Sequence, residues 1–281
     1  MKRILSAVLA LMLCLSLCAC GKKPVEAPTE PATQPPTQAP TAAPTEPATE
    51  PPTEAPTEPA VPEVIPGSAT AIFKDEGENP VLEMRVTLPA CEGLPQIDGY
   101  YKAIYDDLYA TCALNAEEAA QRRSELVTDG LDFTPWAVEV DCEITRNDGK
   151  TLSLLREVYE NLGGAHPLVT YRAETFDVAS QGRLLLGDLF TVSEDEYLSR
   201  LKDLILPQMD KLETDSGVLY FDYAREELMT LLDPMDFALT GDSLLIFYNE
   251  YALAPYAAGL QHFYLPLSDL ADILNPLYFA E

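Results

Sequence analysis

His166 is the side chain of this sequence with the most direct capacity for chemistry, because an imidazole can take up or release a proton near neutral pH. It lies in the turn Leu162-Gly163-Gly164-Ala165-His166-Pro167. The two adjacent glycines allow a positive φ or a very close backbone approach, and Pro167 favours an extended conformation at His166. The histidine could act as a general base or contact a ligand, or it could only bond the backbone of its own turn.

Tyrosines near the C-terminus form the second group with binding capacity. They are Tyr248, Tyr251, Tyr256 and Tyr264. A tyrosine ring can stack on a sugar or anchor a protein partner, since it offers a large apolar face and a polar tip. Packing in a core or a loop is the alternative for the same residues. The candidate ligand-binding residues are Gly163, Gly164, His166, Tyr251 and Tyr256.

The carboxylates do not form a catalytic pair in the sequence. The adjacent acids Asp106-Asp107 and Glu117-Glu118 fall in one helical run, where neighbours point in different directions. A retaining glycosidase needs two carboxyl groups about 5 Å apart across a cleft. G-x-S-x-G, H-E-x-x-H and phosphate-loop motifs do not occur either. We therefore assign no catalytic residue and expect no cofactor.

Three cysteines remain in the part expected to fold, Cys91, Cys112 and Cys142. An odd number permits at most one internal disulfide and leaves one thiol over. No pair has the spacing of zinc ligands, and only two histidines accompany them, so we predict no metal site. Cys112 falls on the apolar stripe of a predicted helix, which favours a buried thiol unless Cys91 lies within reach.

The elements that must position His166 are two strands, residues 151–161 before its turn and residues 168–178 after it. Asp148-Gly149 predicts a hairpin from an alternating strand that starts at Trp136, so three consecutive antiparallel strands are expected. Upstream, the patterns predict strands at 69–75 and 81–88, followed by a long helix over 97–127 with one apolar stripe.

The second half of the folded part predicts a smaller set of elements. Ser193 and Glu196 suggest a capping box for a helix to about Leu212, which Pro207 should kink. The other expected elements are a helix at 223–232, a hairpin of 236–240 and 243–248, a strand at 261–265 and a helix at 268–274. The predicted fold class is α+β, with antiparallel sheets and packed helices in two sub-lobes, residues 67–178 and 179–281.

The N-terminus predicts a bacterial lipoprotein signal peptide over residues 1–19. Lys2 and Arg3 precede an apolar run that ends in Leu17-Cys18-Ala19-Cys20-Gly21. This run is too short to span a bilayer. Cys20 would be the lipidated first residue of a protein anchored to the extracytoplasmic face of the cell membrane. An ordinary secretory signal is the alternative.

Residues 20–66 predict a disordered spacer rich in Pro, Thr and Glu. Ala27-Pro28-Thr29-Glu30-Pro31 recurs at 43–47 and at 55–59, and so many prolines with so little apolar surface favour an extended, unfolded segment. At about 3.1 Å per residue it could hold the following domain on the order of 100 Å from the membrane. Its threonines could also carry O-linked sugar.

Residues 67–281 contain 39 acidic and 14 basic residues, a net charge of −25. This charge argues against nucleic acid and anionic lipid as partners and favours a basic protein. Solubility outside the cell is the plainer explanation of the same charge.

Three segments in order carry a family resemblance. They are Gly163-Gly164-Ala165-His166, residues 182–190 (GRLLLGDLF) and residues 247–259 (FYNEYALAPYAAG). The chain resembles the extracytoplasmic domain of lysozyme-responsive anti-sigma factors and the non-catalytic region of peptidoglycan deacetylases. The resemblance implies an extracellular, two-part α+β domain tied to cell-wall stress, which binds lysozyme in the anti-sigma case. We expect neither a sigma-factor-binding segment nor a deacetylase domain here.

Two functions follow as hypotheses. The first is a lipid-anchored binding or sensing module for lysozyme or another cell-wall-associated partner. The second is an enzyme or accessory domain acting on peptidoglycan, with His166 and an acidic residue as acid and base. A structural surface lipoprotein without a specific ligand is a third possibility.

Overall fold

The computed structural model describes residues 60–279. The predicted signal peptide, the lipidated Cys20 and most of the predicted spacer lie outside the described residues. Strand β1 begins at Val64, so the folded part starts three residues before the predicted Gly67. Between residues 60 and 279, no helix combines the length and the apolar character that a membrane crossing requires.

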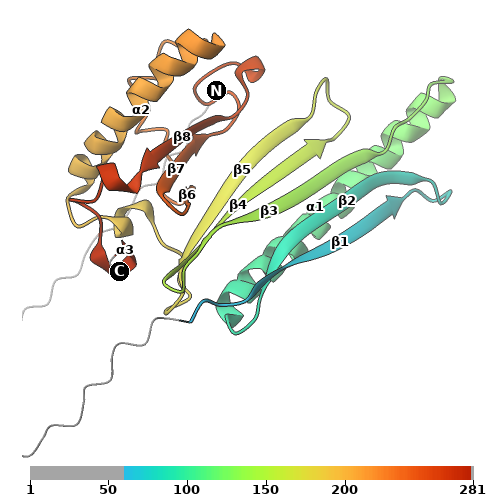
Figure 1. Cartoon of the computed structure of the whole chain (residues 1–281). Helices are drawn as coiled ribbons and strands as arrows, with labels where there is room; N and C mark the ends of the chain where they lie inside the picture. Colours follow the sequence, from blue (N-terminus) through green and yellow to red (C-terminus); the bar gives the residue numbers. More distant parts are fainter. Residues whose placement is uncertain (1–59, 280–281) are drawn as a thin grey trace, which may run out of the picture. The chain divides into compact units, whose positions relative to one another are not determined.

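A five-stranded sheet and one long helix are formed by the first half of the described chain (Figure 1). The strands lie in the order β1-β2-β3-β4-β5. Their bounds are β1 Val64–Lys74, β2 Pro80–Cys91, β3 Trp136–Asn147, β4 Thr151–Asn161 and β5 Leu168–Asp177, with helix α1 at Pro95–Thr128. The predicted strands and the predicted long helix are thereby confirmed.

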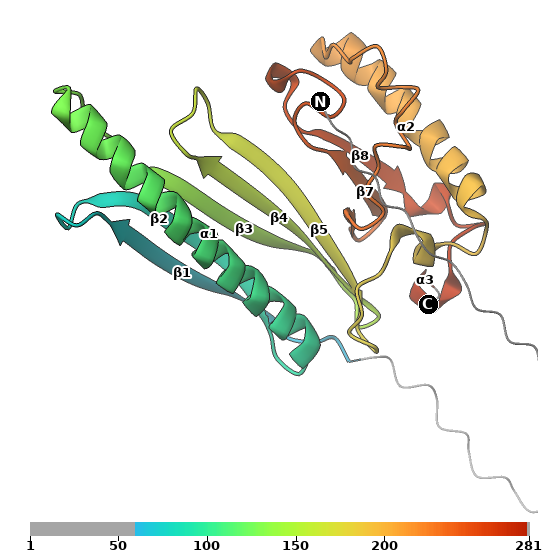
Figure 2. The same cartoon turned by 180° about the vertical axis from the view of Figure 1, so that it is seen from behind.

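One strand pair departs from the prediction of antiparallel sheets. β2 and β3 are parallel, whereas the other neighbouring pairs of this sheet are antiparallel. A parallel pair needs a long crossover connection, and the 34-residue helix α1 supplies it. The sheet is therefore mixed, and α1 lies across one of its faces (Figure 2).

The core between α1 and the sheet follows the predicted stripe. Ile97, Tyr101, Cys112 and Ala119 of α1 are buried together with alternate residues of β2 and β3. All three cysteines among the described residues are free. Cys112 is only 1% exposed, as the stripe predicted, and this burial, with a smaller contribution from Glu160, raises the pKa of its thiol to about 11.

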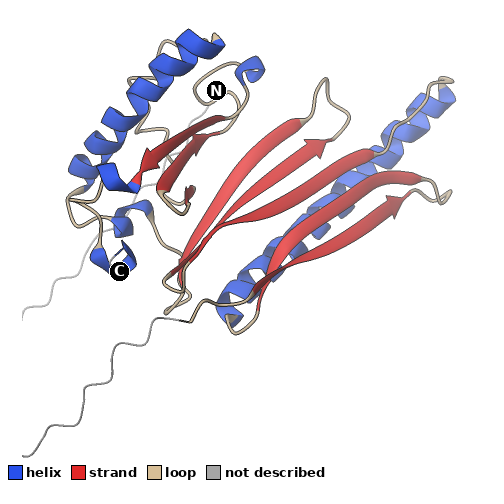
Figure 3. Cartoon of the chain, in the orientation of Figure 1, coloured by secondary structure: helices blue, strands red, loops and turns tan. Residues whose placement is uncertain are grey.

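The second half of the chain forms a three-stranded antiparallel sheet (Figure 3). This sheet has a hydrophobic core of its own. Its strands are β6 Phe237–Leu239, β7 Ser243–Tyr248 and β8 Gln261–Pro266. The helices are α2 Glu194–Ser216 and α3 Pro276–Phe279, with short 3₁₀ helices η1 Leu186–Leu189, η2 Tyr256–Ala258 and η3 Leu267–Asp269. The fold class α+β is confirmed.

Three local predictions are wrong in this half. Residues 223–232 form successive turns, because the segment buries little beyond Ala224 and Leu228 and such a short helix needs packing to persist. Residues 268–274 form no continuous helix, since the backbone of Ile273 bonds Thr191 instead. Ser193 makes no side-chain cap bond, and its carbonyl accepts the amides that close the first turn of α2.

The two sheets contact each other on the face of the large sheet that is opposite α1. Ala173 of β5 packs with Ala238, Leu245 and Phe247 of the small sheet. The Leu239 amide donates to Ser153 Oγ at 2.8 Å, and the Thr175 hydroxyl donates to the Phe237 carbonyl at 3.2 Å. The described part of the chain therefore forms one compact unit with two cores.

Candidate functional site

Three of the predicted ligand-binding residues meet, although they come from distant parts of the sequence. His166 precedes β5, whereas Tyr251 and Tyr256 lie in the loop between β7 and β8. The ring centroids of His166 and Tyr256 are 4.0 Å apart. The Tyr251 hydroxyl lies 3.4 Å from His166 Nε2, and the two tyrosine rings are 6.0 Å apart. We call these three side chains the aromatic cluster.

Hydrogen bonds define how the histidine is held. His166 Nδ1 lies 2.9 Å from the Pro167 carbonyl, which can only accept, so Nδ1 carries the proton. In the neutral ring, Nε2 is then the acceptor for the Tyr251 hydroxyl. The Tyr256 hydroxyl donates to the same Pro167 carbonyl at 3.3 Å. His166 therefore both bonds its own turn and contacts the second loop.

The aromatic cluster is open to solvent. His166 is exposed, the Tyr251 side chain is 51% exposed, and Tyr256 is half-buried. Tyr251 also has a φ of 65°, a left-handed conformation that an aromatic residue rarely adopts. Such strain is commonly found at binding sites and persists only where the surroundings enforce it. Exposed aromatic rings on a constrained backbone suit recognition more than core packing.

The two predicted glycines differ in their roles. Gly163 has a φ of 75°, and a Cβ built on it would lie 2.6 Å from Trp136 Nε1. Trp136 is the buried first residue of β3, so the turn lies directly against the sheet. Gly164 has no positive φ, and a Cβ there would make only an ordinary contact of 3.6 Å. The requirement for glycine holds at Gly163 alone.

Two of the four grouped tyrosines do not join the cluster. Tyr248 is buried in the core of the second sheet, where its hydroxyl donates to the Leu228 carbonyl at 2.6 Å. Tyr264 is 50% exposed on β8, and its ring contacts no aromatic ring of the cluster within residues 60–279. The packing alternative therefore describes Tyr248, and only Tyr251 and Tyr256 belong to the site.

Asn249 positions the loop that carries the two tyrosines, a role that the sequence analysis missed. The Tyr171 amide donates to Asn249 Oδ1 at 2.6 Å, and Asn249 Nδ2 donates to the Tyr171 carbonyl at 3.1 Å. The side-chain amide thus pairs with β5 as another strand would. Its position immediately after β7, which ends at Tyr248, is the only signal the sequence offered.

Asp236 also bonds the edge of β5, two residues after Tyr171. It accepts from the Ala173 amide at 3.2 Å and pairs with Arg172 at 2.8 Å. Arg183 donates to the Ala173 carbonyl at 2.7 Å. These contacts hold the loops of the second sheet against β5.

The acidic pairs of the long helix do not converge on one another, and the buried Glu174 has structural partners. Asp106, Asp107, Glu117 and Glu118 are all exposed on α1, and Asp106 pairs with Lys102 at 3.2 Å. Glu174 is only 1% exposed, but it pairs with Arg156 at 2.7 Å and accepts from Tyr101, as a structural buried acid does. No group of three potential ligands within this range could hold a metal ion.

His262, the other histidine, lies on β8 and is not part of the aromatic cluster. Its ring stacks on Tyr171, with the centroids 4.8 Å apart. Burial lowers the pKa of His262, while the Glu157 carboxylate acts in the opposite direction. The buried Nε2 has no hydrogen-bond partner among the described residues.

The fold and the site together define a two-part α+β domain with an exposed aromatic surface where its two parts meet. Residues 75–169 match the family described as Deacetylase PdaC, and residues 187–268 match the family described as Protein of unknown function (DUF3298). His166 lies in the first matched segment and both cluster tyrosines lie in the second. The matches confirm the family resemblance and indicate an extracytoplasmic, cell-wall-related domain.

Solved structures share this fold. A DUF3298-family protein from Bacteroides fragilis superposes with a TM-score of 0.58 at 16% identity, over 79% of this chain and 98% of that one. A DUF3298-family protein from Pseudomonas aeruginosa gives a TM-score of 0.53 at 17% identity, over 78% of this chain and 96% of that one.

Two mycobacterial proteins are similar in sequence. Immunogenic protein MPT64 of Mycobacterium tuberculosis and immunogenic protein MPB64 of Mycobacterium bovis are each 27% identical to this chain over 165 residues, which is 55% of this chain and 69% of the relative.

Gly163→Ala should destabilise the protein by about 1–3 kcal/mol, because alanine is strained at positive φ and its Cβ would clash with Trp136. Gly164→Ala, the matched control, should change the free energy of unfolding by less than about 0.5 kcal/mol. Urea unfolding followed by fluorescence measures both, since Trp136 is the only tryptophan of the chain. Equal effects of the two substitutions would contradict this account of the turn.

Lowering the pH from 7.5 to 5.5 should destabilise the wild type more than His262→Phe. Because burial lowers the folded-state pKa below the usual 6.5, protonation is harder in the folded chain than in the unfolded one. The stability from neutral His262 is thus present above pH 6.5 and is lost as the pH falls towards the folded pKa. Urea midpoints at both pH values test this, and parallel losses in the two proteins would refute it.

Proposed function

We propose that the chain is a lipid-anchored protein of the bacterial cell surface whose α+β domain binds a cationic, cell-wall-associated protein such as lysozyme through the aromatic cluster. The observation that carries the proposal is the meeting of His166 with Tyr251 and Tyr256 across the two parts of the fold. The exposed rings of His166 and Tyr251, together with the half-buried Tyr256, form an aromatic surface of the kind that anchors protein partners.

Charge supports the choice of partner. The net charge of −25 over residues 67–281 would attract a basic protein and speed its association. An aromatic ring also binds Lys and Arg by cation–π contact, which suits a basic surface. The family matches support the cell-wall setting, and the N-terminal sequence supports lipid attachment at Cys20. Peptidoglycan itself is the alternative ligand and belongs in the same experiment.

The test is binding of the full-length protein to lysozyme by calorimetry, at low and physiological salt, with cytochrome c as an unrelated basic control. Tyr251→Ala should weaken lysozyme binding by about tenfold or more, because it removes an exposed ring from the cluster. Tyr264→Ala removes an equally exposed ring elsewhere and should leave the affinity unchanged.

Equal binding to lysozyme and cytochrome c that disappears at physiological salt would contradict a specific site, since charge alone would then account for it. Equal effects of Tyr251→Ala and Tyr264→Ala would contradict the aromatic cluster. Binding to insoluble peptidoglycan without binding to lysozyme would show that the ligand is the wall polymer and not the protein.

The anchor has its own test. Cys20→Ala removes the thiol that would carry the lipid, so the protein should move from the membrane fraction to the soluble fraction of the producing cells. Cys91→Ala is the matched control, since Cys91 lies inside the folded domain, and it should stay with the membrane. Retention of Cys20→Ala in the membrane would refute lipid attachment at this residue.

A further inference from the structure

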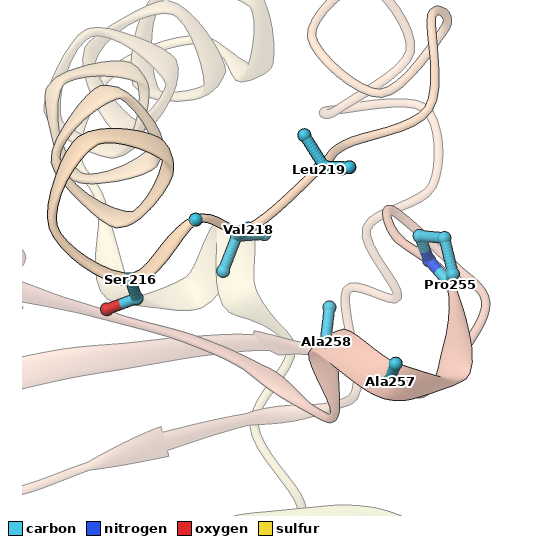
Figure 4. Close-up of a pocket in the computed structure, with 7 residues that line it drawn as sticks. Ser216, Val218, Leu219, Pro255, Ala257 and Ala258 are labelled. Carbon is cyan, nitrogen blue, oxygen red and sulfur yellow. The ribbon is translucent and has the colours of Figure 1, made fainter.

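An open groove of about 320 Å³ adjoins the aromatic cluster through the 3₁₀ helix η2 (Figure 4). One wall is formed by Ser216, the last residue of α2, and by residues 217–219 after it, and the other is formed by Pro255, Ala257 and Ala258. Tyr256, the first residue of η2, contacts His166 instead. A single turn of chain therefore contributes to both surfaces.

Hydrogen bonds within the protein hold the two walls of the groove in place. Gly217 has a φ of 68° and ends α2, its amide donating to the Leu212 carbonyl. The Phe221 amide donates to the Leu253 carbonyl at 2.9 Å. Gln261, only 4% exposed, accepts from the Tyr220 hydroxyl at 2.9 Å and donates to the Ala258 carbonyl at 2.9 Å. The two walls are thus tied together.

The lining is suited to an aliphatic group. Val218 and Leu219 lie across the groove from Pro255 and Ala258 (Figure 4), and the Leu219 side chain is 77% exposed. Ser216 is the only lining residue with a polar side chain. The volume of the groove is at the lower end of the range for ligand pockets, which is about 300–1,000 Å³. A side chain of a protein partner fits this lining better than a sugar with many hydroxyls.

Two exposed carboxylates flank, in sequence, the wall that carries Leu219. Asp215 directly precedes Ser216, and Asp222 comes three residues after Leu219. Within residues 60–279, neither takes part in an ion pair, whereas Asp210 and Glu213 share Arg225 at 2.8 and 2.9 Å. The groove therefore combines aliphatic side chains with exposed backbone, and carboxylates that form no ion pair within the described residues lie close to it along the chain.

We propose that the groove accepts an aliphatic side chain from a cationic segment of the protein partner, with Lys or Arg residues on either side of it facing Asp215 and Asp222. The proposal rests on the proposed function and specifies its partner more closely. Charge complementarity selects the basic residues, and the aliphatic lining selects the residue between them.

Three short fluorescent peptides provide the test with full-length protein: alternating Lys and Leu, alternating Lys and Ser, and alternating Glu and Leu. The Lys–Leu peptide should bind at least about tenfold more tightly than either of the others by anisotropy. Leu219→Arg should weaken its binding by about tenfold, because it blocks the groove and adds a like charge. Leu114→Arg adds the same charge at a leucine of α1 that is 68% exposed and should have little effect.

Equal binding of the Lys–Leu and Lys–Ser peptides would overturn the proposal, as would equal losses in Leu219→Arg and Leu114→Arg. The outcome is distinguishable from failure of the proposed function. If lysozyme does not bind but the Lys–Leu peptide shows the expected dependence on Leu219, the groove stands and the partner is another cationic protein. If Tyr251→Ala weakens lysozyme binding while Leu219→Arg leaves peptide binding unchanged, the groove assignment is wrong.

Discussion

The free edge of β5 is the constraint on which the rest of this structure depends. An edge strand exposes unpaired amides and carbonyls that must find partners or stay in water. Here the Asn249 side chain exchanges two hydrogen bonds with the backbone of Tyr171, and the Asp236 carboxylate accepts from the Ala173 amide. The backbone of residues 182–184 pairs with the last residues of the same edge. Side chains of the second part and this short backbone segment thus occupy the place of a sixth strand, and one compact unit results.

This side-chain pairing also determines where the binding surfaces lie. Asn249 precedes Tyr251 by two residues, and His166 lies two residues before the start of β5. Holding Asn249 against β5 therefore brings the tyrosine loop to the histidine turn and supports the strained backbone of Tyr251. The same loop continues into η2, which lines the groove. Both proposed surfaces depend on this attachment.

Local signals in the sequence predicted much of this arrangement. Asp148-Gly149 and the double glycine at 163–164 gave the hairpins correctly, and the apolar stripe gave α1, because turn chemistry and helical periodicity are properties of neighbouring residues. His166, Tyr251 and Tyr256 were predicted as separate candidates. Their meeting required the tertiary fold, as did the parallel pairing of β2 with β3 and the burial of Tyr248. Asn249 was missed because its role depends on a strand 78 residues away.

Hydrogen exchange at the Tyr171 amide, in the wild type and in Asn249→Leu, measures whether the Asn249 side chain holds the second part against the edge of β5. We expect strong protection in the wild type and exchange about five- to tenfold faster in the variant, because one bonded amide loses its acceptor. The near-ultraviolet signal of the aromatic cluster should weaken in parallel. Asn275→Leu, which removes an asparagine bonded to the Asp188 carbonyl, should leave both observables unchanged. Unaltered Tyr171 exchange and an unaltered tyrosine signal in Asn249→Leu would show that the Asn249 side chain does not hold the tyrosine loop against β5.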